Sequence, residues 1–422
     1  MDLRAMNSGV SGLLAEQQAL GVVGDNIANV NTVGFKAQRA IFEDVLGHSI
    51  LAGTTSGLPG SGVAIGDIQQ QFTQGSLNTT GISTDVALSG DGFFVVNGAV
   101  DGISGNFYTR AGQFNLDKDG YLVNPNALKV QGYAANGDGT FSATTSAIQA
   151  PTSSIQPRST TTAAVTANLD ANATVPTNAW GDANSSFASQ SNFSSTMTVY
   201  DSLGNDHTMD LYFRNTAAGA WEWHAVMDGT DTNSTGTLTF GTNGALTAIG
   251  GSTVTFAPAN ADPMSIALNF GTAGAAGAAP IPGSMTGFGS ASNVSSQSQD
   301  GYTSGDFSGI SIDGQGVVMG LYTNGQKLAI SQLAVAKFRS NDGLGRAGQT
   351  LWIDTRDSGP AAMGTAASGG RGSVSSGSVE SSNVDLASEF VSMIQHQRSF
   401  SANSKTITTA DEMLQELINI KR

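Results

Sequence analysis

The chain has 422 residues, of which 39% are hydrophobic and 12% are charged, so it is long enough for about two to four domains with buried cores. Its formal net charge of −15 argues against nucleic acid and against an anionic membrane surface, because both attract basic proteins. The absence of cysteine excludes disulfides, thiolate catalysis and zinc–cysteine sites.

The N-terminal segment does not have the pattern of a secretory signal. It contains Asp2 and Glu16, has no continuous apolar core and lacks a small-residue cleavage site. No stretch of the chain approaches the roughly 18 apolar residues of a membrane-spanning helix. If the protein leaves the cell, we expect an export route without signal cleavage and without insertion into the membrane.

The first predicted element is a helix from Asp2 to about Val30. Apolar residues recur along it at alternating gaps of three and four, which is typical of one helical seam, although Gln17 and Gly24 interrupt it. Its glycines each cost about 1 kcal/mol relative to alanine, so the helix alone should be marginally stable. The seam residues are Leu3, Met6, Val10, Leu13, Leu20 and Ile27.

A polar and glycine-containing motif follows this helix. Its asparagines can bond backbone groups locally and end a helix, and Gly34 permits backbone angles that other residues resist. We predict that the motif turns the chain from the helix toward the next domains, with Phe35 as an apolar anchor; the alternative is an ordinary helix stop and a surface loop. The motif consists of Asn26, Asn29, Asn31, Thr32, Gly34, Phe35 and Lys36.

The middle of the chain is predicted to be β-structure. Short apolar runs such as DVALSGDGFFVV and FNLDKDGYLVN are broken by Asp-Gly turns, and Asn324-Gly325 indicates a hairpin. Residues 143–162 and 271–283 have the composition of linkers. This order predicts a multidomain α+β protein with coiled-coil-like helical ends and two mainly-β domains, one inserted in the other. The predicted divisions are a terminal helical domain (1–35 and 382–422), a connecting segment (36–80), an inner β domain (81–155 and 295–381) and an outer β insert (156–294).

A second helix is predicted from about Asn383 to the end, with Ser382 as its cap and Asp385 completing a capping box. The run from Asn383 to Arg422 has no Gly or Pro, and its apolar residues again step by three and four. The two terminal seams could pack on each other or on copies of the same chain. The seam residues of this helix are Leu386, Phe390, Met393, Phe400, Ile407, Leu414 and Ile418.

Residue patterns for catalysis or metal binding are weak. The four histidines lie far apart and have no cysteine partners. Asp117-Lys118-Asp119-Gly120 is similar to the start of a calcium loop, but Tyr121 stands where a fifth-position oxygen ligand is needed, so a tight turn is predicted. We therefore predict no catalytic site, no metal, no cofactor and no enzyme activity.

Three separate blocks of the sequence resemble the bacterial flagellar rod and hook proteins. They are LAEQQALGVVGDNIANVNTVGFKAQRAIFED near the N-terminus, LSGDGFFVV with YTRAGQFNLDKDGYLVN, and residues 382–422. The middle segments 192–215 and 300–326 resemble the hook branch of this family, whose members carry an extra outer domain that the shorter rod proteins lack.

This resemblance implies a structural subunit that polymerises with itself into a curved, flexible hollow tube. Such a tube joins rod to filament outside the cell and transmits motor torque as a universal joint. The implied partners are the distal rod protein, the hook cap, the hook–filament junction protein and the flagellum-specific type III export apparatus. The alternatives are a distal rod protein of the basal body or, in a different class, a secreted β-rich adhesin.

Overall fold

The computed structural model describes residues 4–46, 60–137 and 139–420, and the chain forms two compact units. The first unit comprises Met1–Thr152, Gly309–Gly320 and Lys327–Arg422, and the second comprises Ser153–Ser308 and Leu321–Gln326. The second unit is therefore inserted into the first. This arrangement, with helical chain ends and two mainly-β parts, confirms the predicted fold class.

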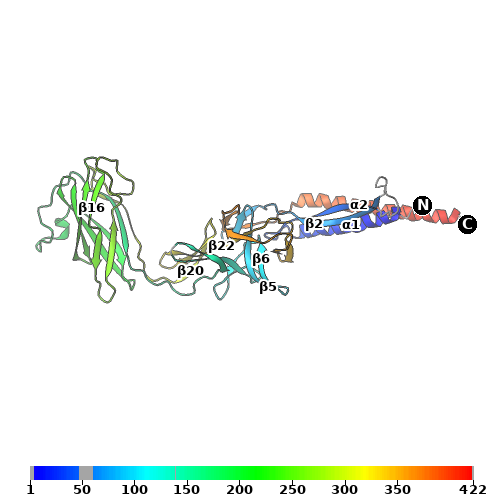
Figure 1. The fold of residues 1–422 in the computed structure, drawn as a ribbon, viewed down its shortest axis with the longest axis horizontal. Coiled ribbons are helices and arrows are strands. Elements are labelled where there is room, and N and C mark those ends of the chain that lie inside the picture. Colours follow the sequence, from blue (N-terminus) through cyan, green and yellow to red (C-terminus); the bar gives the residue numbers. More distant parts are fainter. Residues whose placement is uncertain (1–3, 47–59, 138, 421–422) are drawn as a thin grey trace. The chain divides into compact units, whose positions relative to one another are not determined.

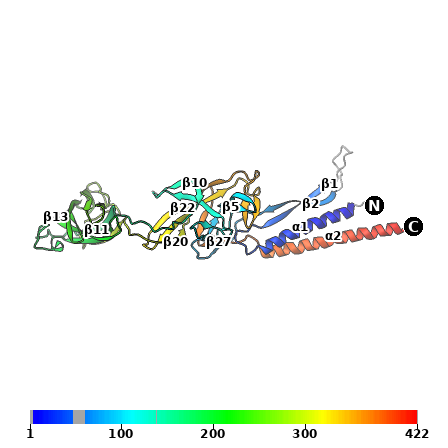
Figure 2. The ribbon, with the colours of Figure 1, turned by 90° about the horizontal axis from the view of Figure 1, so that it is seen from below.

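Two helices from opposite ends of the sequence pair within the first unit. Helix α1 (Arg4–Ala28) and helix α2 (Leu386–Ile420) lie side by side, with both chain ends at the same end of the pair (Figures 1 and 2). The helices are thus antiparallel, and the 35 residues of α2 span about 52 Å. The N-cap of α2 is Asp385, whose Oδ1 accepts hydrogen bonds from the N–H groups of Ala387 (2.9 Å) and Ser388 (3.1 Å). The prediction of Ser382 as the cap is wrong, because the Asp385 carboxylate itself satisfies the first free N–H groups.

The segment predicted only as a connection contains a β-hairpin. Strand β1 (Gln38–Leu46) pairs antiparallel with β2 (Gly60–Gln70), and the hairpin packs on α1. An isolated two-stranded hairpin is marginally stable, so its packing on α1 supports it.

A β domain completes the first unit. Its large sheet follows the order β20–β21–β22–β9–β5–β6–β24–β23 among the described residues. Aromatic side chains fill its core: Phe93 contacts Phe72, Phe338 and Trp352 with ring centroids 5.4–5.9 Å apart. The strands are β3 (Leu77–Thr79), β4 (Val86–Ser89), β5 (Phe93–Val100), β6 (Ile103–Thr109), β7 (Asn115–Leu116), β8 (Leu122–Val123), β9 (Lys129–Ala135), β10 (Phe141–Ala147), β20 (Phe307–Ile312), β21 (Val317–Tyr322), β22 (Lys327–Lys337), β23 (Gly345–Gly348), β24 (Leu351–Ile353), β25 (Ala362–Thr365), β26 (Ser373–Ser376) and β27 (Ser378–Glu380).

The second unit packs two sheets around one apolar core. One sheet has the order β12–β13–β14–β15–β16 and the other β17–β18–β11–β19. Alternate residues of the strands point inward, and Phe213, Trp221, Trp223 and Phe270 are fully buried between the sheets. Its elements are β11 (Thr162–Asn168), the short 3-10 helix η1 (Phe187–Ser189), β12 (Phe193–Tyr200), β13 (Asp206–Ala217), β14 (Ala220–Met227), β15 (Thr230–Phe240), β16 (Leu246–Gly250), β17 (Thr253–Phe256), β18 (Met264–Asn269) and β19 (Asn293–Gln299).

One histidine links two turns of the second unit. The Nδ1 atom of His207 lies 2.7 Å from Asp228 Oδ2, and its Nε2 lies 3.4 Å from Asp201 Oδ2. Burial alone lowers the pKa of His207, but its hydrogen bonds to Asp228 and Asp201 outweigh burial and raise the pKa above the usual value. Against the opposing effect of burial, the bond to His207 lowers the pKa of Asp228. The pKa of Asp201 is also lowered, mainly by hydrogen bonds from Asn205 and to a smaller extent by the bond to His207.

We expect this bridge to make the second unit less stable at alkaline pH. A raised histidine pKa stabilises the folded state below the unfolded value of about 6.5, and that stability is lost as the pH rises through the folded pKa. Because Asp228 is half-exposed, the loss should be roughly 0.5–1 kcal/mol. Urea unfolding of the full chain between pH 6 and pH 9, followed by tryptophan fluorescence, measures it. His207→Gln should remove this pH dependence; an unchanged slope in that variant would contradict the assignment.

Candidate functional site

The polar motif after α1 forms a junction that joins both terminal helices to the β domain. Asn26 is fully buried; its Oδ1 accepts a hydrogen bond from Gln38 N (2.9 Å), and its Nδ2 donates to Gln38 O (2.8 Å) and to Glu389 Oε1 (3.1 Å). One asparagine side chain thereby connects α1, β1 and α2. Burial, as the main cause, raises the pKa of Glu389.

The next residues of the motif end the helix. Asn29 Nδ2 donates to the backbone oxygen and to Oδ1 of Asp25, both at 2.9 Å, and Thr32 Oγ1 donates to Asn29 Oδ1 at 3.0 Å. Asn31 is exposed. These local bonds compete with the helical pattern and release the chain into the turn.

Gly34 brings the turn into direct contact with the β domain. Its φ is +71°, and a Cβ added there would lie 2.5 Å from Ala111 N and 2.8 Å from the carbonyl carbon of Arg110. Its N–H donates to Glu380 O at 2.8 Å, and the side chain of the following Phe35 is buried. The motif therefore needs a residue without a side chain at this position, for both conformation and space.

A buried charge cluster lies beside this turn. Glu380 accepts from Lys36 Nζ (2.6 Å), from Arg110 Nη1 (3.2 Å) and from Gly75 N (2.9 Å), while Lys36 Nζ also donates to Thr73 O (2.7 Å). The side chains of the three charged residues are at most 5% exposed. Burial lowers the pKa of Lys36 and of Arg110 and is the largest influence on each, although Glu380 opposes it. One carboxylate thus balances two cations inside the protein.

Asn383, just before α2, connects this part of the chain to the segments before β1 and after β2 by hydrogen bonds. Its Oδ1 accepts from Ala37 N (2.7 Å), and its Nδ2 donates to Gln71 O (2.7 Å) and Thr73 Oγ1 (2.8 Å). The sequence analysis missed Asn383, Glu380 and Arg110. They are close to the motif only in space, and no periodic pattern marks them.

The helices pair through small and polar residues. A Cβ added at Gly9 would lie 2.9 Å from Ile407 Cγ1, and one added at Gly12 would lie 2.6 Å from Asn403 Nδ2, so α2 fits closely against both glycines. Glu16 Oε2 lies 2.6 Å from His396 Nδ1. Polar contacts of this kind fix the register of a helix pair while adding little apolar burial.

No predicted seam residue whose side chain the structure describes is fully buried. Helix α1 instead buries a set of neighbouring positions: Ala15, Ala19, Val22, Val23 and Asn26. Of the predicted seam residues, Ile407 is half-buried against Gly9. Four of the others are exposed, namely Val10, Leu386, Phe390 and Phe400. Six are half-buried, namely Met6, Leu13, Leu20, Ile27, Met393 and Leu414. Leu3 and the side chain of Ile418 lie outside the described residues.

An apolar stripe runs along one side of α2, and we call it the outer stripe. It consists of Leu386, Phe390, Val391, Ile394 and Phe400, whose exposed fractions lie between 38% and 55%. Sequence analysis missed Val391 and Ile394 in this stripe and the exposed Leu14 on α1. A search for a wider apolar face than a strict seam would have found them.

The loop at residues 117–120, whose sequence is similar to the start of a calcium loop, forms a tight turn that is held by internal hydrogen bonds. Asp117 Oδ1 accepts from the N–H groups of Asp119 (2.9 Å) and Tyr121 (2.8 Å). Across the part of the chain that the structure describes, no three His, Asp or Glu side chains converge to hold a metal ion. No helix within residues 4–46, 60–137 and 139–420 combines the length and the apolarity that a membrane crossing requires.

Four protein-family models match successive parts of the chain. Residues 6–36 match a flagella basal body rod protein model, and residues 87–179 match the flagellar hook protein FlgE/F/G D1 domain. Residues 168–302 match the flagellar basal body protein FlaE D2 domain, and residues 375–420 match the C-terminal part of the flagellar basal body rod FlgEFG proteins. The first match covers α1 from residue 6 onward together with the junction motif, and the last contains α2.

Full-length relatives support the same assignment, and one solved structure has a similar fold. The chain is 36% identical to flagellar hook protein FlgE of Escherichia coli K12 over 99% of this chain and 100% of that one. It is 34% identical to the FlgE of Borreliella burgdorferi over the same shares. Its fold is similar to the crystal structure of Helicobacter pylori flagellar hook protein FlgE2, with a TM-score of 0.50 at 15% identity over 70% of this chain and 98% of that one. The chain therefore belongs to the flagellar hook protein FlgE family.

Proposed function

We infer that this chain is the structural subunit of the bacterial flagellar hook and propose that it polymerises through its terminal helices. The outer stripe of α2 is the observation that carries the assembly proposal, because it leaves apolar surface beside a helix pair that is already complete. As a member of a structural flagellar family, the chain acts by assembly and not by catalysis.

Repeated contacts between copies would bury this stripe. Fully burying a large apolar side chain stabilises by about 1.5–3 kcal/mol, so five half-exposed side chains offer several kcal/mol to an interface. A contact between two different faces that does not close on itself produces an open helical fibre. The predicted terminal seams, including Val10, Phe390 and Phe400, would then lie between neighbouring copies.

The finer proposals concern the tube and its neighbours. We propose a curved, flexible hollow tube outside the cell that joins rod to filament and transmits torque. The subunit would leave through the flagellar export apparatus without signal cleavage and meet the distal rod protein, the hook cap and the hook–filament junction protein. Support comes from the family and from the inserted second unit, which follows the hook pattern. A straight, rigid polymer in electron micrographs would favour a distal rod protein instead.

Replacing Phe390 by glutamate should prevent or greatly weaken polymerisation. The variant loses about 1–1.5 kcal/mol of apolar burial and places a charge in an apolar interface, so the critical concentration should rise at least about tenfold. Sedimentation of polymer against protein concentration measures this. Gln395→Glu, an exposed charge change on the same helix, is the control. Normal assembly of Phe390→Glu would remove the outer stripe from the proposal.

Removing most of the second unit should leave polymers of altered curvature. Arg158 and Tyr302 exchange two backbone hydrogen bonds (2.9 and 3.0 Å), so an Asn-Gly pair can replace residues 159–301 as a two-residue hairpin loop. Because the terminal helices are untouched, we expect tubes whose curvature or stiffness differs in electron micrographs. Complete loss of tubes from a folded deletion variant would show that the second unit is needed for assembly itself.

A further inference from the structure

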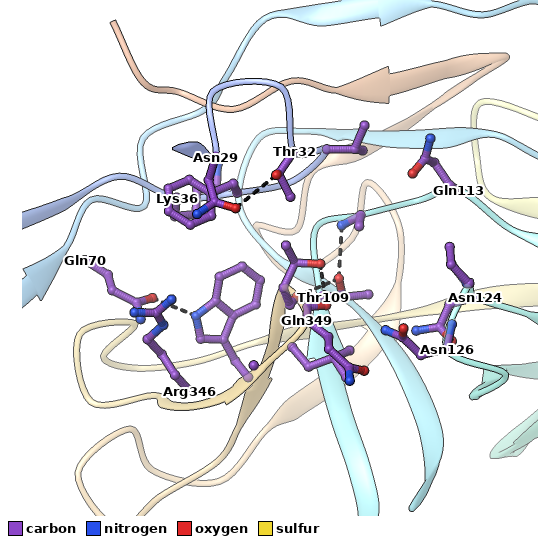
Figure 3. A pocket seen from close by; sticks show the side chains of 18 residues that line it. Asn29, Thr32, Lys36, Gln70, Thr109, Gln113, Asn124, Asn126, Arg346 and Gln349 are labelled. Atoms are coloured by element: carbon purple, nitrogen blue, oxygen red, sulfur yellow. Dashed lines mark hydrogen bonds between the residues drawn. The ribbon is translucent and has the colours of Figure 1, made fainter. Parts of the chain in front are cut away.

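A pocket of about 400 Å³ opens in the first unit beside the junction (Figure 3). The turn after α1, the end of β2, the turn between β8 and β9, and the turn between β23 and β24 provide its walls. The function proposed above does not use it.

The pocket is lined by apolar side chains, among them Val33, Phe35 and Trp352, together with amides and two cationic residues. Lys36 and Arg346 are its charged lining residues, but the Lys36 ammonium is buried against Glu380, so Arg346 is the cation that the pocket presents. No carboxylate of the described residues lines it. Arg346 is half-exposed, and its Nη2 lies 3.8 Å from Asp25 Oδ2, a long ion pair that leaves part of the side chain open to solvent. Such a lining favours a partner that carries carboxylates.

Three amides at the pocket have no hydrogen bond inside the chain as described. The side chains of Gln113, Asn126 and Gln349 are exposed and lie around the opening (Figure 3). Each amide can both donate to and accept from a peptide backbone. The pocket can therefore bind an extended segment without needing a particular side chain.

One wall of the pocket is a strained turn. Gln349 (φ +53°) and Thr350 (φ +58°) connect β23 to β24 in the left-handed region, which is unfavourable for L-residues. Thr109 Oγ1 donates to Thr350 O at 2.9 Å and holds the turn in place. Strain of this kind tends to persist where a surface has to keep a particular shape.

The β1–β2 hairpin has a face of matching chemistry. Phe42 and Val63 line a groove with Gly12 on the helix side, so strand alternation directs Glu43 and Val45 away from the helices. Glu43, Val45 and the β2 residue Asp67 are exposed. We call this the outward face of the hairpin, and nothing among the described residues covers it.

We propose that this pocket receives the outward face of the β1–β2 hairpin of a second copy of the chain. The carboxylates of Glu43 and Asp67 complement a pocket that has Arg346 and no acid, and the free amides satisfy backbone groups along the strand. The hairpin of the same chain cannot do this, because Gln70, the last residue of β2, already lines the pocket and the strands continue along α1 (Figure 2). The inference rests on the proposed polymerisation.

Crosslinking tests the contact directly, since the chain has no cysteine of its own. A chain with Glu43→Cys and Asn126→Cys is assembled and treated with a short bismaleimide. In the polymer, we expect the crosslinker to produce a ladder of linked chains. Below the critical concentration, where no polymer forms, we expect no ladder. Glu43→Cys with Ile82→Cys, an exposed site on the same β domain, is the control and should give no ladder.

A second variant fills the pocket. Asn126→Trp should raise the critical concentration about tenfold, which corresponds to 1.4 kcal/mol, while Lys118→Trp at a fully exposed turn should not. If the unmodified chain forms no polymer, the proposed function fails and this inference with it. If it polymerises, but the Glu43/Asn126 pair links no better than the control and Asn126→Trp assembles normally, the pocket is not a subunit contact. If Asn126→Trp forms a normal polymer but no longer binds a different protein, the inference is also overturned, because the pocket would then bind that protein and not a second copy of the chain.

Discussion

Replacing Glu380 by glutamine will destabilise the first unit by about 3–5 kcal/mol, because it leaves Lys36 and Arg110 buried without a carboxylate. Lys36→Met should cost less, since the Arg110–Glu380 pair and the bond from Gly75 N survive. Urea unfolding of the full chain gives the free energies. Hydrogen exchange at Gly75 N, which donates to Glu380 Oε1, reports the loss locally.

The order of the two variants is the critical result. A cluster with two cations and one anion requires Glu380→Gln to be the more damaging change. Asp119→Asn, which removes an exposed ion pair with Lys118, should change stability by less than about 1 kcal/mol and serves as the control. Equal effects of Lys36→Met and Glu380→Gln would show that the cluster acts through packing alone.

Adding a single methyl group at Gly34 will also strongly destabilise the junction. Gly34→Ala must adopt a left-handed backbone, at roughly 1–2 kcal/mol, and must push back the backbone at Ala111, at roughly 1–3 kcal/mol. We expect a total loss of about 2–5 kcal/mol in urea unfolding, together with failure to form tubes.

Gly102→Ala separates the two causes. Gly102 has a φ of +84° with open space around it, so only the conformational part should remain there. If Gly34→Ala lowers the free energy of unfolding by no more than Gly102→Ala does, the close approach of Gly34 to the β domain does not contribute to stability.

Local patterns predicted the elements and their order. The Gly- and Pro-free run after Asn383 indicated α2, and Asp-Gly and Asn-Gly dipeptides indicated the hairpins of the β domains. The motif around Gly34 was located because glycine and asparagine change local backbone preferences. These features depend on neighbouring residues, which a sequence shows directly.

The contacts between distant residues could not be found this way. Lys36 and Glu380 are 344 positions apart, and no hydrophobic periodicity around either residue indicates that the two are in contact. The contacts that pair the two helices were missed for a related reason: Gly12 against Asn403 and Glu16 against His396 carry no hydrophobic signal, yet their shapes and charges fix the pairing. Hydrophobic periodicity identifies apolar surface, and four of the residues that it identified, namely Val10, Leu386, Phe390 and Phe400, are exposed.

The junction has a mechanical consequence. The first and last segments of the chain are both anchored where Glu380 contacts Lys36, Arg110 and Gly75, and Gly34 N bonds the backbone oxygen of the same residue. A pull or twist on the helix pair therefore loads several short bonds in parallel, and they must shear together instead of opening one after another. In a rotating shaft, stiffness at this point would let the helices and the β domain turn as one piece and leave compliance to other parts of the molecule.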